Sequence, residues 1–190
     1  MTLVFLPEKE EYLIEKLEEL INQKSDILIE ILNNVLNLRI KKISMEGKIE
    51  IQGISGYDFR LIKLKTTLEK QEIDMYIKMV KRCKIKESIF CYWYTINEEE
   101  NEGKSNNNAL QKATISELTK KKYKQSIFLG FENEKNEILE AGTEVDFLDI
   151  TKYIREQGTE ENKYLELLKY FQTEENEDDE VLLIGIKMSK

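Results

Sequence analysis

The sequence predicts an α+β fold in a single domain of 190 residues. An apolar pattern of helical period fills the first 37 residues, and short β-rich segments separated by turn residues follow from residue 39 onward. The composition agrees, because 41% hydrophobic and 35% charged residues suit one globular unit with its own core. We therefore expect an N-terminal helical pair over 1–37 and a sheet-containing core over 38–190, built on a mixed β-sheet.

The N-terminal segment predicts two helices. Pro7 suits the first turn of a helix, where its missing amide donor is not needed. The inner face of this first helix carries four apolar residues at helical spacing: Leu13, Leu17, Leu20 and Ile21. Ser25 is a preferred N-cap residue, and the wide apolar stripe that follows predicts a second, largely buried helix that ends near Asn37.

The next segment predicts strands and then a third helix. Apolar residues between 40 and 51, interrupted at Gly47 and Gly53, are typical of a hairpin, and a further strand follows Gly56. Thr66 and Glu69 match a capping box, which predicts a helix packed on the sheet. Its outer face would carry lysines, as a solvated surface or, alternatively, as a face that follows a phosphate backbone.

Two later segments, 88–96 and 181–188, predict strands, and a polar segment follows the first of them. Residues 88–96 show no polar alternation, which predicts a central strand covered on both faces. Residues 98–108 are polar and rich in asparagine, and they predict an exposed loop. The last strand is predicted over 181–188, at an edge of the sheet.

The remaining elements are predicted from shorter patterns. Residues 109–122 are ambiguous between a strand and a short helix. The others are a hairpin over 127–131 and 137–141, a short strand over 145–150, and C-terminal helices over 151–157 and 164–171.

The chain contains no histidine, and its two cysteines form no motif. Because imidazole is the side chain that titrates near neutral pH, its absence favours a binding protein over an enzyme and predicts no cofactor. No apolar stretch is long enough to cross a bilayer, and the first residues do not form a signal peptide. These features predict a cytoplasmic protein of a bacterial cell or of a phage-infected host, with no membrane contact.

Charge is distributed unevenly along the chain. Residues 39–86 hold 13 basic and 6 acidic residues, a net charge of +7, whereas residues 132–180 hold 5 basic and 17 acidic residues, a net charge of −12. The whole chain carries −8 at pH 7. Because phosphate binding depends on lysine and arginine, this balance argues against free nucleic acid as the main ligand and favours a basic protein.

A dense acidic run near the C-terminus is the main candidate for partner binding. Its members are Glu174, Glu175, Glu177, Asp178, Asp179 and Glu180. The alternation and the turn glycine of an EF-hand loop are missing, so we do not expect a calcium site. The alternatives are a solvated acidic loop and an electrostatic docking patch for a basic partner, and we adopt the second as the working hypothesis.

A catalytic alternative depends on carboxylates and lysines near the predicted strands. Glu50 and Asp58 are the minimum pair for a magnesium site that activates water. Lys63 or Lys65 would steady the phosphate in such a site. Single acidic residues near strand ends are more often structural, and we favour no catalytic residue.

Three segments resemble the Rpn-type branch of the PD-(D/E)XK nuclease and transposase superfamily. Residues 25–36 (SDILIEILNNVL) are similar to an early ILISFLNAIL-like helix of that family, and residues 48–52 (KIEIQ) to its strand with a Glu-x-Gln pair. Residues 148–152, followed by 164–171, are similar to its closing strand and helix. The family's metal-binding aspartate has no counterpart, because residues 39–45 contain no carboxylate, so the resemblance implies that Glu50 and Gln52 are relics and that cleavage is lost.

Together these patterns predict a non-enzymatic acidic inhibitor of the anti-defence, anti-CRISPR-like type, encoded by a phage or mobile element. Its partner would be a basic enzyme that processes nucleic acid, and its carboxylates would occupy that enzyme's phosphate channel. A metal-dependent nuclease, active or degenerate, is the first alternative. A structural subunit that uses its N-terminal helices as an interface is the second.

Overall fold

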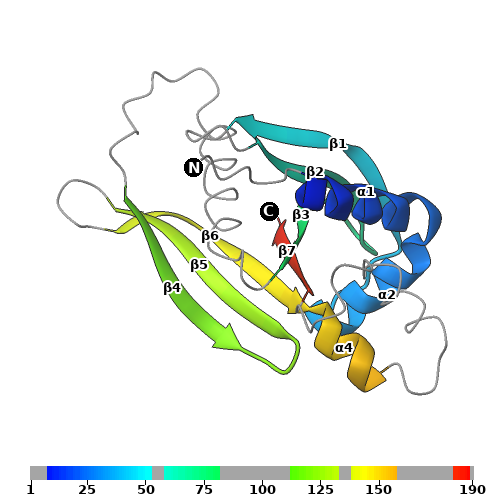
Figure 1. The fold of residues 1–190 in the computed structure, drawn as a ribbon. Coiled ribbons are helices and arrows are strands. Elements are labelled where there is room, and N and C mark those ends of the chain that lie inside the picture. Colours follow the sequence, from blue (N-terminus) through cyan, green and yellow to red (C-terminus); the bar gives the residue numbers. More distant parts are fainter. Residues whose placement is uncertain (1–7, 53–57, 82–111, 133–137, 158–181, 189–190) are drawn as a thin grey trace.

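The computed structural model describes residues 8–52, 58–81, 112–132, 138–157 and 182–188, shown as coloured ribbons in Figure 1. Its elements are α1 (Glu8–Gln23), α2 (Ser25–Leu36), β1 (Lys42–Gln52), β2 (Asp58–Thr67), β3 (Glu72–Lys81), β4 (Lys112–Lys120), β5 (Lys124–Glu132), β6 (Ile138–Asp149), α4 (Ile150–Gln157) and β7 (Leu182–Met188). The α+β class and the N-terminal helix pair packed on a sheet are confirmed.

The strands of this part of the chain form one seven-stranded sheet in the order β1-β2-β3-β7-β6-β5-β4. All six pairings are antiparallel, so the expectation of a mixed sheet was wrong. Two of these pairings follow from the connections: β2 and β3, like β4 and β5, are joined by tight turns, and a tight turn can only join antiparallel strands. The sheet consists of two three-stranded meanders, the first formed by β1-β2-β3 and the second by β4-β5-β6, with β7 between them.

β7 lies in the middle of this sheet, between β3 and β6, and the prediction of an edge strand was wrong. Ile184, Gly185 and Ile186 are buried. The run Leu-Leu-Ile-Gly-Ile shows no polar alternation, which is the pattern of a strand covered on both faces. Residues 88–96, which show the same pattern and are predicted to form a central strand, lie outside the described part of the chain.

The prediction of a third helix was also wrong, because its residues form the end of β2, a turn and β3. Thr66 belongs to β2, and Leu68 N donates to Gln71 O (2.8 Å) to close the turn, so there is no capping box. Every residue from Met75 to Val80 is buried. A strand that is covered on both faces places apolar residues at nearly every position, and some of these match a helical period by coincidence.

β1 is one continuous strand rather than a hairpin broken at Gly47. Its pairing with β2 shifts by one residue between Met45 and Gly47, which marks a β-bulge. A Cβ atom added to Gly47 would meet nothing within 4 Å, so the glycine does not serve a close approach. Glycine in a strand is typical of such a bulge.

The second meander matches its predictions more closely. The hairpin over 127–141 is confirmed as β5 and β6, and the ambiguous segment 109–122 contains β4. The short strand predicted over 145–150 is the end of β6, and the helix over 151–157 is confirmed as α4. Several predictions lie outside the described residues: Pro7, Gly53, Gly56, the loop 98–108 and the helix 164–171.

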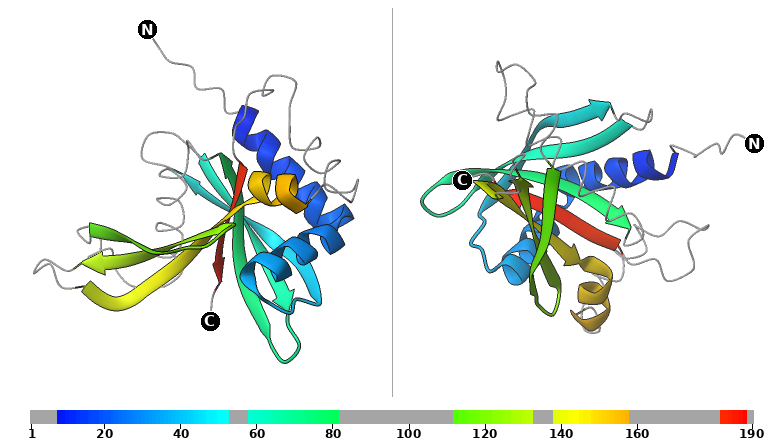
Figure 2. Two further views of the ribbon diagram at one scale, coloured as in Figure 1. Left: turned by 90° about the horizontal axis from the view of Figure 1, so that it is seen from below. Right: turned by 90° about the vertical axis from the view of Figure 1, so that its left-hand side faces the viewer.

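The helix pair covers one face of the sheet. Figure 2 shows α1, α2 and α4 on the same side, and the apolar residues of all three helices share one buried cluster with β2, β3, β6 and β7. Leu17, Leu28 and Leu32 are fully buried in it. Ser25 is the first residue of α2 and not its N-cap, since Lys24 occupies that position without a side-chain hydrogen bond. Asn37 ends the helix in the left-handed conformation, where asparagine is tolerated.

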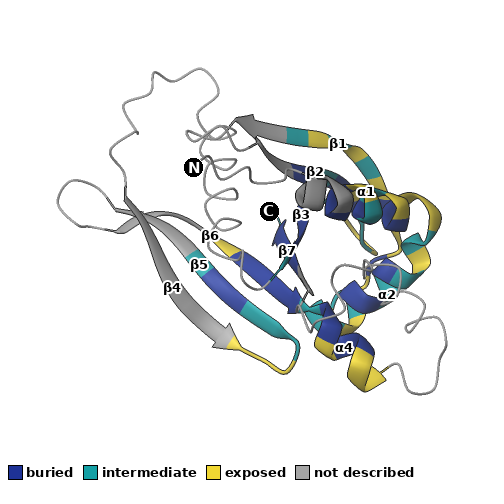
Figure 3. Ribbon diagram, viewed as in Figure 1, coloured by how far each residue is buried: buried dark blue, intermediate teal, exposed yellow. Residues whose placement is uncertain are grey.

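The alternation of β3 separates the two faces of the sheet. Met75, Ile77 and Met79 belong to the helix-side cluster, whereas Tyr76 and Lys78 are buried on the opposite face. Figure 3 shows long buried stretches in the central strands β3, β7 and β6. The sheet therefore buries residues on both of its faces.

Replacing Thr66 with valine is expected to raise the free energy of unfolding by about 1 kcal/mol. The Thr66 side chain is fully buried on the helix side, and its Oγ1 has no hydrogen-bond partner among the described residues. Valine keeps the β-branched shape and removes the uncompensated hydroxyl. Urea unfolding measures the change, and Thr67→Val is the control, because Thr67 is only partly buried. Equal effects at the two positions would contradict the prediction.

Candidate functional site

The six acidic residues of the C-terminal run (Glu174, Glu175, Glu177, Asp178, Asp179 and Glu180) lie outside the residues that the structure describes. Their role as a docking patch stays a prediction. Helix α1, in contrast, is described and is also strongly acidic, with six glutamates and two lysines among 16 residues. Its apolar side faces the core, and Glu15 and Glu19 are exposed.

Two ion pairs fix charged side chains of α1. Lys48 of β1 pairs with Glu18 and ties the helix to the edge strand, and Lys16 Nζ lies 3.9 Å from Glu19 Oε2. Glu15 pairs with no cation in the described part of the chain. The helix therefore holds part of its negative charge on the surface in a fixed orientation.

The two candidate catalytic carboxylates lie on neighbouring strands. Glu50 of β1 is paired with Arg60, and Asp58 of β2 is paired with Gln52. Glu50 and Asp58 are therefore diagonal neighbours, a relation that typically spans about 7–8 Å. The backbone therefore places the two residues on adjacent strands, on the same face of the sheet.

The two candidate lysines lie farther along β2 and have other partners. Lys63 and Asp58 are five residues apart on one strand, a distance of about 17 Å. Lys63 Nζ lies 3.6 Å from Glu46 Oε2 and 3.8 Å from Asp74 Oδ2, and Lys65 Nζ lies 3.1 Å from Glu72 Oε2. The hydrogen bond to Glu72 and its charge raise the pKa of Lys65. The structure thus places both lysines in ion pairs between strands.

No group of three or more acidic or cysteine side chains in the described ranges is placed to hold a metal ion. The hypothesis of a magnesium site at Glu50 and Asp58 stays a prediction.

A row of cations and one aromatic ring crosses the sheet on the face opposite the helices. Lys63, Tyr76 and Lys187 are cross-strand partners on β2, β3 and β7. The Nζ atoms of Lys63 and Lys187 lie 5.9 and 5.4 Å from the centroid of the Tyr76 ring. Cations at this distance from an aromatic face are attracted to it, so the row contributes to holding the three strands together.

A buried polar cluster lies between β5 and β6, where β6 begins to pair with β7. Ser126 Oγ donates a hydrogen bond to Asp146 Oδ1 (2.6 Å), and Lys124 Nζ lies 4.0 Å from the same oxygen. Asp146 is 5% exposed and is the first residue of β6 that pairs with β7. Burial raises the pKa of the Asp146 carboxyl, with Glu144 also raising it, against the opposing effects of Ser126 and Lys124.

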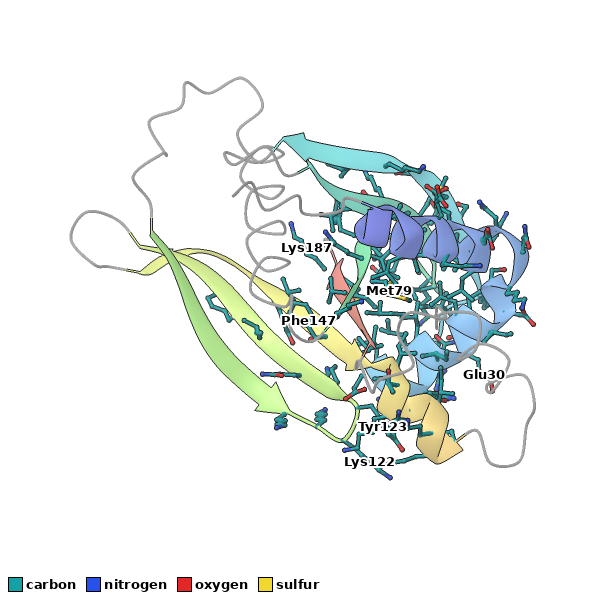
Figure 4. The ribbon with its side chains drawn as sticks, in the orientation of Figure 1. Glu30, Met79, Lys122, Tyr123, Phe147 and Lys187 are labelled. Carbon is teal, nitrogen blue, oxygen red and sulfur yellow. The ribbon has the colours of Figure 1, made fainter. Side chains whose placement is uncertain are left out.

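A basic corner forms where the turn between β4 and β5 meets α4. It consists of five exposed cations: Lys120, Lys121, Lys122, Lys152 and Arg155. Figure 4 shows Lys122 and Tyr123 beside α4. The corner was missed in the sequence because the helix and the turn are separated by some 30 residues, although the run Lys-Lys-Lys-Tyr-Lys at 120–124 was a visible signal.

These features define an α+β protein with an antiparallel seven-stranded sheet, a helical layer on one face, an acidic first helix and a basic corner. The chain matches no protein-family model, no curated protein and no solved structure. None of the helices in the described ranges is long and apolar enough to span a membrane.

Proposed function

We propose that this protein is a non-enzymatic acidic inhibitor that binds a basic partner, and that the partner is an enzyme that processes nucleic acid. The observation that carries the proposal is the concentration of negative charge, with a net charge of −12 over residues 132–180. A channel that binds phosphates is lined by lysine and arginine, and such a channel attracts carboxylates by the same field. The inhibitor would occupy the channel in place of the nucleic acid.

The arrangement of α1 supports this proposal. Leu13, Leu17 and Leu20 hold the helix against the sheet, so that its glutamates are presented by a rigid element. Rigid presentation lowers the entropic cost of binding, and complementary charge raises the association rate. The same leucines are buried inside this chain, which makes them a poor interface for the assembly subunit considered as an alternative.

The test is capture of the partner by the immobilised protein from lysate of its host, followed by an assay of the captured enzyme. Capture is expected to fall steeply between 50 and 300 mM salt, and the enzyme is expected to lose activity in the complex. Changing Asp178, Asp179 and Glu180 together to lysine should weaken capture by an order of magnitude or more, since it reverses charge at the contact.

The matched control makes the same charge change elsewhere. The control residues are exposed and lie in the first meander: Glu46 in β1, Glu72 in β3 and Glu69 in the turn between β2 and β3. Each pairs with a cation of the same region. Their change to lysine should leave capture within about threefold, because these carboxylates pair with neighbouring cations and are not part of the proposed contact. Equal loss with both variants, or capture that does not depend on salt, would contradict the proposal.

A second candidate function follows from the diagonal placement of Glu50 and Asp58. Two carboxylates at that separation are able to share a magnesium ion that activates water. The nuclease hypothesis predicts degradation of plasmid or RNA that requires Mg²⁺ or Mn²⁺ and that is abolished by Glu50→Ala or Asp58→Ala. Metal-dependent cleavage that survives both changes would exclude this site.

A further inference from the structure

The turn between β4 and β5 is the most basic short segment of the described chain. Residues 120–124 read Lys-Lys-Lys-Tyr-Lys, and Lys120, Lys121 and Lys122 are exposed. Tight hairpin turns favour glycine, asparagine and aspartate, which suit their backbone geometry. None of those residues occurs here, and among the described non-glycine residues only Asn37 has a positive φ. Turn geometry therefore does not explain the lysines.

Tyr123 locks this turn onto α4. Its hydroxyl donates to Glu156 Oε2 (2.5 Å), and its ring meets the ring of Tyr153 edge-on, with centroids 5.2 Å apart. Its carbonyl oxygen accepts a hydrogen bond from Asp149 N (2.8 Å), and Lys121 N donates to Lys124 O (2.7 Å) across the turn. The lysines are therefore carried by a rigid support rather than by a loose loop.

Helix α4 adds cations to the same corner. Lys152 and Arg155 are exposed, and Lys152 lies in the first turn, where its amide donates to the capping Asp149 Oδ1 (2.9 Å). Glu156 is the one exposed carboxylate of α4, and Lys122 Nζ lies 3.2 Å from its Oε2. Lys120, Lys121 and Lys152 make no ion pair with any residue that the structure describes.

We infer that this basic corner is a contact surface for the phosphate backbone of a nucleic acid. Exposed ammonium groups suit phosphates, which position a nucleic acid without reading its sequence. The one aromatic ring of the turn is engaged by Tyr153 and Glu156, so it is not available to stack on a base. The contact is therefore independent of sequence.

The net charge of −8 does not oppose such a contact at physiological salt. The Debye length is about 8 Å at 0.15 M ionic strength, so more distant carboxylates are largely screened and the local cations dominate. The corner adds a second contact to the proposed inhibitor, and it does not depend on the acidic surface. A protein with both surfaces would bind a basic enzyme and the nucleic acid beside it.

The test is fluorescence anisotropy with fluorescein-labelled 20-nucleotide single strands of two unrelated sequences, at 50 to 200 mM salt. The wild-type protein should bind both with similar affinity, and log K should fall with log salt with a slope of about −2 to −3, as for three or four phosphate contacts. The double variant Lys120→Glu, Lys121→Glu should bind at least tenfold more weakly, with an unchanged thermal midpoint.

The control is Lys41→Glu, Lys42→Glu, which makes the same charge change at two adjacent exposed lysines at the start of β1. It should change affinity less than threefold. No binding by the wild-type protein, or equal loss in both variants, would overturn the inference, as would binding of poly-glutamate in place of the strands. The capture assay with the Lys120/Lys121 variant separates the two proposals, because capture through the acidic surface should persist.

Discussion

Replacing Ile184 with alanine is expected to lower the free energy of unfolding by about 3–4 kcal/mol. Ile184 lies in β7, is fully buried and packs in the helix-side cluster. Its strand joins the two meanders, so a cavity here loosens contacts with β3 and with β6 at once. Urea unfolding followed by circular dichroism measures the change, and an unchanged m-value shows that the native fold is retained.

The control for this prediction is the same substitution at an edge strand. Ile49 lies in β1, at one edge of the sheet, and is only partly buried. Ile49→Ala should cost about 1 kcal/mol, because less apolar surface returns to water and less cavity remains. If the two variants lost equal stability, β7 would not be the central strand.

Replacing Asp146 with alanine should lower the free energy of unfolding by about 2–3 kcal/mol at neutral pH. The change leaves the Ser126 hydroxyl, which is fully buried, without its acceptor. It also removes the carboxylate beside Lys124, whose side chain is 16% exposed. Asp146→Asn is the matched variant, because its amide oxygen can still accept the hydrogen bond from Ser126. Its free energy of unfolding should therefore fall much less than that of Asp146→Ala.

The pH dependence of this site has a definite sign. Burial raises the pKa of Asp146 above 3.8, so the folded protein holds this proton more tightly than the unfolded chain. The stability contributed by the protonated carboxyl is complete below that value and is lost as the pH rises through the folded-state pKa. Asn does not titrate, so the free energy of unfolding of Asp146→Asn, measured relative to the wild type, should increase as the pH rises from 3 to 7.

Urea unfolding of both proteins across that range measures the difference. A difference that changes in the opposite direction would mean that the attraction of Lys124 outweighs burial and the repulsion from Glu144. A difference that does not vary with pH would mean that Asp146 is as well solvated in the folded state as in the unfolded chain. Either result would contradict a raised pKa of the buried Asp146 carboxyl.

Local pattern was sufficient for the helices because their evidence lies within one turn of each residue. Leu13, Leu17 and Leu20 recur at helical spacing and are buried on one side of α1. The same method was wrong for β3, where Tyr76 and Val80 matched a helical period only because the strand is buried on both faces. Apolar periodicity shows which residues are buried. When a strand is buried on both faces, its alternating pattern disappears, and periodicity can no longer distinguish it from a helix.

The candidate site shows the same division. The charge imbalance, the acidic character of α1 and the run of lysines at 120–122 can be counted in the sequence. That Lys63 pairs with Glu46 and Asp74, at a distance from Asp58, depends on the register between β1, β2 and β3. Register is set by turns and bulges, such as the one at Gly47, and one shifted residue changes which side chains meet.

Local sequence patterns predict the α+β class, the helix pair, most of the strand segments and the uneven distribution of charge. The strand order and the contacts show that the last strand lies at the centre of the sheet, that Lys78 is buried, and that the lysine-rich turn packs against α4. The physical reason is that helices form from neighbours in the chain, whereas strand order depends on hydrogen bonds between segments that are distant in sequence. Residues 182–188 pair with 75–81 and with 146–149. No local sequence pattern predicts these pairing partners.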